Sequence, residues 1–325
     1  MIVSRSVPLT RVLAGMMVLV IFWLSLSQIP LNYYWGRDDA VITLSHARNL
    51  VDYGFISVNP SGGRVEGYSS PAQFLIYTAL FKTFGLSYDT YFLIQVLVAS
   101  FLLGYCLMLF FENAPWRGLV LTLMAASFLS RDASFLMWHA SGMENAITHV
   151  LFVLATYGMV SITWVERMQL GHFLYIPIVF LAAITRIEAA YYIFPVMAVC
   201  LLASLMFRTQ PRKLRDLLLF FGSVLALWLL FNLWRYHYFC DLYPNTAYGQ
   251  DKGDIITRVA QIVDIRSTVS RVARALARNN LLVHYGYLVP LAAPIFLFAD
   301  KSKKSLVLYA TILVWILLCC FYPFV

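Results

Sequence analysis

Charged residues are scarce in this chain. Asp, Glu, Lys and Arg make up 12% of its 325 residues, against about a quarter in soluble domains. Hydrophobic residues make up 61%, and the mean hydropathy is +0.74. This composition excludes an ordinary soluble domain and predicts an all-α integral membrane protein. The net charge of +8 does not indicate nucleic-acid binding, because the basic residues lie between apolar segments rather than in one patch.

Several motifs are also lacking, and each absence disfavours a class of protein. There is no GxxxxGK[ST] motif, which argues against a nucleotide-driven motor. The five cysteines show neither zinc spacing nor a disulfide framework. The first apolar stretch, 12–28, is long enough to span and has no small-residue cleavage site, so it does not indicate a cleaved signal peptide. No internal repeat is present and span centres hold few ionisable residues, which disfavours a secondary transporter.

Uncharged runs predict about nine spanning helices in a single transmembrane domain over 1–325. The runs are Val12–Ile29, Tyr91–Phe111, Gly118–Trp138, Ala146–Val165, Phe173–Thr185, Ala189–Phe207, Leu217–Trp234, Leu281–Ala299 and Ser305–Phe321. The segment Ala72–Phe84 is apolar but too short to cross and carries Lys82. We therefore expect it to lie along the membrane interface, within a first outer loop over 30–90.

The basic residues predict which loops face the cytoplasm. The short loops 208–216 and 300–304 are rich in Lys and Arg, and with this count of spans they fall on the same side as Arg5 and Arg11. The loops 30–90 and 235–280 then face outward, the second with an amphipathic helix over Asp254–Arg278. Chemistry is therefore expected at the outer face.

Two adjacent carboxylates, Asp38 and Asp39, stand just beyond the first span, where acidic side chains are costly unless they have a function. Successive residues of a helix or strand point in different directions, so the two carboxylates are not expected to share one oxygen. One would meet a substrate hydroxyl while the other orients it, holds a divalent ion or caps the following helix. Capping alone is the alternative explanation.

Further polar residues of the predicted outer face are candidates for binding a substrate. They are Arg48, Arg64, Glu66, Tyr68, Glu144, Arg186, Glu188, Asn245 and Lys252. For the segment 59–71 a plain connecting loop is an equal alternative, and for Arg186 and Glu188 an internal ion pair is a strong one. Arg186 could instead bind a lipid-linked phosphate. The aromatic loop 235–248 would suit sugar faces or mark the membrane interface.

The motifs DDAVITLSHARNL, NPSGGRVEGYSS, SGMEN, TRIEA and YPNTAY, in this order, resemble the polytopic GT-C glycosyltransferases that use polyprenyl-phosphate sugars. The likeness is to the arabinofuranosyltransferase branch of the mycobacterial terminal arabinan type. It implies a GT-C bundle with interfacial helices in the first outer loop and an acidic catalytic residue at Asp38 or Asp39, with Asp39 favoured as base. The chain differs from that family in lacking a C-terminal soluble domain. It also has Arg186-Ile-Glu188 where the family usually has Arg-Pro-Glu.

The expected function is transfer of a sugar, of the arabinofuranose or pentose class, from a polyprenyl phosphate to a glycan, lipid or protein hydroxyl. The reaction is expected at the outer face of a bacterial inner membrane. No cofactor is required, although a divalent cation at Asp38 and Asp39 is compatible with the sequence. A partner subunit could supply the C-terminal part. Two alternatives remain open, a lipid-linked-sugar flippase or transporter and a non-catalytic assembly subunit.

Overall fold

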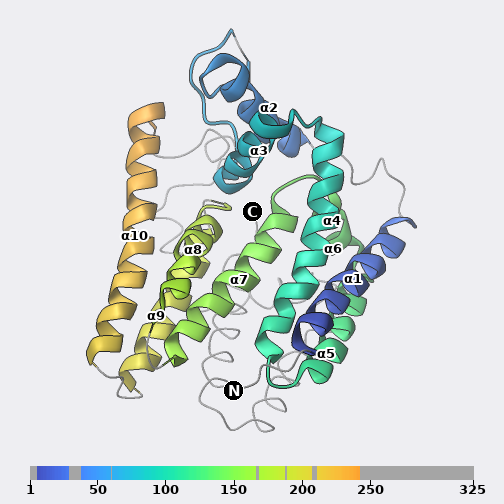
Figure 1. The fold of residues 1–325 in the computed structure, drawn as a ribbon. Helices are drawn as coiled ribbons and strands as arrows, with labels where there is room; N and C mark the ends of the chain where they lie inside the picture. Colours follow the sequence, from blue (N-terminus) through green and yellow to red (C-terminus); the bar gives the residue numbers. More distant parts are fainter. Residues whose placement is uncertain are drawn as a thin grey trace, which may run out of the picture.

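The computed structural model describes residues 6–28, 38–59, 61–165, 168–186, 189–206 and 211–241, and these residues form helices and connecting turns without a strand. Figure 1 shows a bundle of helices with a small layer across one end. The helices are α1 (Ser6–Leu26), α2 (Asp38–Tyr53), α3 (Pro71–Phe84), α4 (Tyr88–Leu107), η2 (Met108–Phe111), α5 (Pro115–Leu129), α6 (Ala133–Ala140), α7 (Asn145–Trp164), η3 (Leu170–Leu174), α8 (Tyr175–Ala183), α9 (Ala190–Met206) and α10 (Pro211–Phe239). The all-α prediction is confirmed over the described residues.

Among the residues that the structure describes, four helices are long and apolar enough to cross a membrane, at Leu9–Leu26, Tyr88–Phe111, Asn145–Thr163 and Arg212–Phe239. Three shorter apolar helices accompany them, at Pro115–Leu129, Leu170–Ala183 and Ala190–Met206. These lengths and compositions indicate a membrane protein. The total of nine spans stays a prediction, because Leu281–Ala299, Ser305–Phe321 and the amphipathic segment Asp254–Arg278 lie outside the described residues.

The prediction of one continuous helix over Gly118–Trp138 is wrong. The structure ends α5 at Leu129 and starts α6 at Ala133. Asp132 causes the break, because its side chain accepts a hydrogen bond from the backbone N–H of Phe135 (3.0 Å) and so caps α6. The seventh predicted span is also longer than expected: α10 continues to Phe239, so residues 235–239 belong to a helix rather than to an outer loop.

The core consists of buried apolar clusters that fix the helices in place. One joins α7, α8, α9 and α10, and a second joins α1, α4, α6 and α7. A third, containing Leu44, Tyr68, Phe74, Tyr77 and Phe92, joins α2 and α3 to the start of α4. The layer of α2 and α3 is thus anchored to the bundle end by its own small core (Figure 1).

The opposite end of the bundle carries basic residues. Glu112, just after η2, accepts hydrogen bonds from Arg11 of α1 (2.6 Å) and from the Tyr157 hydroxyl of α7 (3.2 Å). Lys213, at the start of α10, donates to the backbone carbonyl of Thr163 at the end of α7 (2.5 Å). Arg11 and Lys213 therefore lie at the end away from α2 and α3 (Figure 1).

The segment Ala72–Phe84 lies within α3, whose ends have clear sequence causes. Ser70 caps its start by accepting from the Gln73 N–H, Pro71 occupies the first turn, and Gly85 ends it in the left-handed conformation with φ of 62°. Figure 1 shows α3 lying beside α2 across the bundle end rather than running through it. Its position along a membrane interface stays a prediction.

Candidate functional site

The polar residues of the α2–α3 end are fixed by three sets of contacts. The first joins α2 to the loop that precedes α3. Asn49 of α2 donates from its side-chain amide to the backbone carbonyls of Ser57 (2.7 Å) and Val58 (2.9 Å). His46, also on α2, receives a hydrogen bond from the backbone N–H of Gly67 (3.1 Å). These contacts hold Ser57, Val58 and Gly67 of that loop against α2.

His46 is buried and its ring nitrogens have different partners. Nδ1 lies 2.7 Å from the Ile42 carbonyl oxygen, and Nε2 lies 3.1 Å from the backbone nitrogen of Gly67 and 3.2 Å from the Val65 carbonyl oxygen. Burial lowers the pKa of His46, and two backbone hydrogen bonds offset this only in part. The edge of the ring packs on Tyr68, with ring centroids 5.3 Å apart. The neutral imidazole is thus a structural link between α2 and the loop.

Acidification is expected to weaken this link. Because the pKa of His46 is lower in the folded protein than its ordinary value of 6.5, the unfolded chain takes up the proton first, and stability falls as pH drops below about 6.5. Replacing His46 with Gln should remove this part of the pH dependence and lower the free energy of unfolding by about 1–3 kcal/mol, since the Gly67 N–H loses its buried acceptor.

Denaturant titrations of the detergent-solubilised chain between pH 5 and 8 would measure this effect. His172 lies in η3, where its Nδ1 accepts a hydrogen bond from the backbone N–H of Gln169 (2.9 Å). His172→Gln is the control for replacing a histidine outside the link between α2 and the loop. If the free energy of unfolding depended on pH equally in the unaltered chain and in His46→Gln, His46 would not be the source of this pH dependence.

The second set of contacts joins the same loop to α10. Glu66 is 3% exposed, and its two carboxylate oxygens accept hydrogen bonds from Nε (2.8 Å) and Nη2 (2.6 Å) of Arg235. Arg235 also donates from Nη1 to Asn232 (3.1 Å). Arg64 lies over the ring of Tyr238, 4.7 Å from its centroid. The hydroxyl of Tyr238 accepts from the backbone N–H of Ile56 (3.2 Å). The end of α10 is thereby tied to both ends of the loop.

This environment determines what Glu66 and Tyr68 can do. Burial raises the pKa of Glu66, although Arg235 opposes the shift. Burial also raises the pKa of Tyr68, whose ring is stacked on Phe74 with centroids 4.6 Å apart. Glu66 therefore links the loop before α3 to α10 through Arg235, and Tyr68 packs in the apolar core of α2 and α3. A direct substrate contact for either residue stays a prediction.

The third set of contacts surrounds the turn between α6 and α7. Gln73 of α3 donates to the carbonyl of Gly142 (2.6 Å) and to the side chain of Gln95 (3.2 Å), and Gln95 of α4 donates to the carbonyl of Met143 (2.5 Å). Both glutamines are buried. The turn that presents Glu144 is therefore fixed by side chains from two other helices.

Glu144 of this turn forms an ion pair with Arg186, which follows α8. The Glu144 side chain is 2% exposed and that of Arg186 is 25% exposed. The backbone N–H of Ala72 donates to the carbonyl of Ile184 (3.1 Å), so the first turn of α3 is bonded to the segment that carries Arg186. The ion pair expected from the sequence, between Arg186 and Glu188, stays a prediction because Glu188 lies outside the described residues. The pair that the structure shows for Arg186, with Glu144, was not expected.

A methyl group added at Gly142 should disrupt this turn. Gly142 has φ of +79°, which costs about 1–2 kcal/mol for another L-residue. A Cβ there would also lie 2.5 Å from ring atoms of Phe92. Gly142→Ala should therefore lower the free energy of unfolding by about 2–4 kcal/mol.

Gly222, inside α10, has open space where a methyl group would extend, with no neighbouring atom within 4 Å. Gly222→Ala is therefore the control and should be neutral or stabilising, by up to about 1 kcal/mol. Chemical denaturation of both variants measures the difference. A Gly142→Ala variant as stable as Gly222→Ala would show that the turn is not held as described.

Asp38 and Asp39 form the first turn of α2. Asp39 is exposed, and its backbone carbonyl accepts from the hydroxyl of Thr43 (3.1 Å). Arg48 lies further along α2, where it pairs with Asp52 (3.3 Å) and covers Phe81. Glu188, Asn245 and Lys252 lie outside the described residues. Arg186 and its partner Glu144 lie near the start of α3, because the Ile184 carbonyl accepts from the backbone N–H of Ala72. Tyr68 stacks on Phe74 of α3, whereas Glu66 pairs with Arg235 of α10. Asp39 lies on α2, which packs against α3, and its meeting with Arg186 at one site stays a prediction.

Sequence reasoning missed four residues that position this region: His46, Gln73, Gln95 and Arg235. Arg235 had a usable signal, since it is a cation at the end of a long apolar run. His139 and His149 lie side by side: their Nδ1 atoms are 3.2 Å apart and their rings are stacked. Nε2 of His139 also lies 3.0 Å from the hydroxyl of Ser100.

Within the described ranges, no group of three or more His, Cys, Asp or Glu side chains is arranged to hold a metal ion. The alternative of a divalent ion at Asp38 and Asp39 stays a prediction. No protein family, curated protein or solved structure matches the chain. A functional assignment therefore has to stand on the residues and their geometry.

Proposed function

We propose that the protein is a membrane glycosyltransferase that moves a sugar from a polyprenyl phosphate to an acceptor hydroxyl at the outer face of a bacterial inner membrane. The sugar is of the pentofuranose class, arabinofuranose in the nearest resemblance. The proposed site lies at the bundle end covered by α2 and α3. It is away from the end that carries Arg11 and Lys213, as the basic-residue bias of cytoplasmic loops would require.

The observation that carries the proposal is the environment of Arg186. Its guanidinium is held by a carboxylate that is 2% exposed, while a quarter of the arginine side chain is accessible. A cation fixed in this way at the end of an apolar helix, α8, suits a site where negative charge grows on a lipid-linked phosphate. Arginine forks also match phosphate oxygens.

Each residue then has a defined part in the reaction. The carboxylate of Asp39 takes the proton from the acceptor hydroxyl, and the hydroxyl oxygen forms a bond to the anomeric carbon of the sugar. The bond between that carbon and the phosphate oxygen breaks, and polyprenyl phosphate leaves with the electron pair. Arg186 stabilises the charge on the leaving phosphate, and Glu144 keeps Arg186 in position. Glu66 and Arg235 hold the covering layer over the site.

Mass spectrometry of the envelope of a deletion strain tests this function. The strain should accumulate glycan, lipid or protein acceptors that lack one class of sugar, and the gene in trans should restore them. The variant Arg186→Lys keeps the charge at Glu144 but loses the guanidinium fork, so it should restore them only in part. An envelope identical in composition with and without the gene would refute the proposal.

A further inference from the structure

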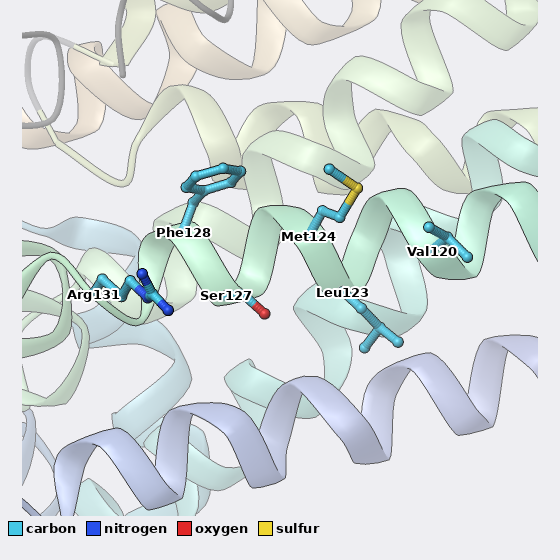
Figure 2. A pocket seen from close by; sticks show the side chains of 6 residues that line it. All are labelled: Val120, Leu123, Met124, Ser127, Phe128 and Arg131. Carbon is cyan, nitrogen blue, oxygen red and sulfur yellow. The ribbon is translucent and has the colours of Figure 1, made fainter. Parts of the chain in front are cut away.

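A shallow hollow of about 450 Å³ lies along α5, away from the proposed transfer site. It is lined by Val120, Leu123, Met124, Ser127, Phe128 and Arg131. Figure 2 shows these side chains in sequence along the helix, with Arg131 at one end and Val120 at the other. None of the residues assigned to sugar transfer lines it.

The apolar part of the hollow faces outward. Val120, Met124 and Phe128 are 57%, 51% and 41% exposed, and they recur at every fourth position, which places them on one face of α5. In a membrane protein such a face contacts hydrocarbon chains. From Val120 to its end at Leu129, α5 rises by about 14 Å, which is close to the thickness of one leaflet of a hydrocarbon core of about 30 Å. Arg131 follows in the turn after the helix.

The polar end of the hollow carries a positive charge. Arg131 is exposed, and no ion pair joins it to a carboxylate among the residues that the structure describes. The neighbouring carboxylate, Asp132, instead caps α6 through the Phe135 N–H. A guanidinium beside hydrocarbon is costly without an anionic partner, and a phosphate diester is one that its donors fit.

We propose that this hollow binds one anionic phospholipid, with an acyl chain along Val120, Met124 and Phe128 and the phosphate at Arg131. The apolar part of the hollow is about as long as one leaflet is thick, so it fits the acyl chain of one lipid. The positive charge of Arg131 favours an anionic head group over a zwitterionic one. One side of α5 packs against α1, and α6 begins just after Arg131. A lipid whose phosphate binds Arg131 would therefore cover the turn between α5 and α6. This site is independent of the proposed transferase activity.

Native mass spectrometry of the purified full chain tests the proposal. Titration with dioleoyl phosphatidylglycerol should give one tightly retained lipid, and dioleoyl phosphatidylcholine should not. Arg131→Gln should weaken phosphatidylglycerol retention by about tenfold, as expected for loss of a charged hydrogen-bonding partner. Ser127→Trp, which fills the hollow and keeps Arg131, should weaken it similarly.

Arg117, exposed near the other end of α5, supplies the matched control. Arg117→Gln should bind the lipid as the unaltered chain does. Equal retention by Arg131→Gln and the unaltered chain would overturn the proposal, and so would an equal loss in Arg117→Gln, which would indicate attraction to any surface arginine. A dimer of the chain formed in place of the lipid complex would also overturn it.

Discussion

Replacing Asp39 with Asn is expected to lower the rate of sugar transfer by about 10²–10⁴-fold, the usual contribution of a general base. The change keeps the size of the side chain but removes its ability to accept the hydroxyl proton. Asp39 is exposed in the first turn of α2, and Asn also serves at helix starts, so the fold should be retained. Binding of the polyprenyl-phosphate donor should therefore persist, and kcat should fall more than KM rises.

The experiment is a transfer assay with purified protein in lipid nanodiscs, together with donor binding measured separately. Asp52→Asn is the matched control, because Asp52 is an exposed carboxylate on the same helix that pairs with Arg48. It should transfer sugar at the unaltered rate. Full activity in both Asp38→Asn and Asp39→Asn would show that neither carboxylate is the base. Capping of α2 would then be the role of the two residues.

Replacing Arg235 with Met is expected to lower the free energy of unfolding by about 3–5 kcal/mol, because it leaves the carboxylate of Glu66 buried without its partner. Both side chains are nearly inaccessible, at 7% and 3%. The double variant Glu66→Leu with Arg235→Met should be more stable than Arg235→Met alone, since no charge is then left in the interior. Chemical denaturation of the two single variants and the double variant measures the coupling.

The pH dependence provides a second check on this pair. Burial already raises the pKa of Glu66, and without Arg235 that pKa should rise further. A carboxyl whose pKa is higher in the folded state favours folding most at low pH and loses that contribution as pH rises through its folded pKa. The decrease in the free energy of unfolding caused by Arg235→Met should therefore become smaller as the pH is lowered toward 4.5, the ordinary pKa of Glu.

The exposed pair of Arg48 and Asp52 is the control for the buried one. Its side chains are 55% and 38% exposed, so Arg48→Gln should change stability by no more than about 1 kcal/mol. A Glu66→Gln variant that stays fully stable but loses sugar transfer would contradict the structural role given to Glu66. It would support the direct substrate contact predicted from the sequence.

Much of the fold could be predicted from local sequence. The apolar runs placed α4, α7, α8 and α9 to within a few residues, because helix length and hydropathy are properties of a continuous segment. The start of α1, at Ser6, lies six residues before the predicted start at Val12. The break between α5 and α6 was missed since it depends on one capping carboxylate, Asp132, inside an otherwise apolar run.

The pairings at the candidate site could not be predicted in the same way. Glu66 and Arg235 are 169 positions apart, and Glu144 and Arg186 are 42 apart. Periodicity assigns each residue to a face of its own helix and does not identify its partner on another one. The count of spans predicts an outer position for Glu144 and Arg186, whereas the contact between them depends on the packing of α7 against α8.

Transfer of a sugar from a polyprenyl phosphate by the chain itself can be tested directly. Purified protein in proteoliposomes is supplied with the donor labelled in its sugar and with an acceptor outside. We expect the label to appear on the acceptor and one free polyprenyl phosphate to be released for each sugar transferred. Intact donor moved across the bilayer, or donor left unchanged by the folded, unaltered chain, would contradict it.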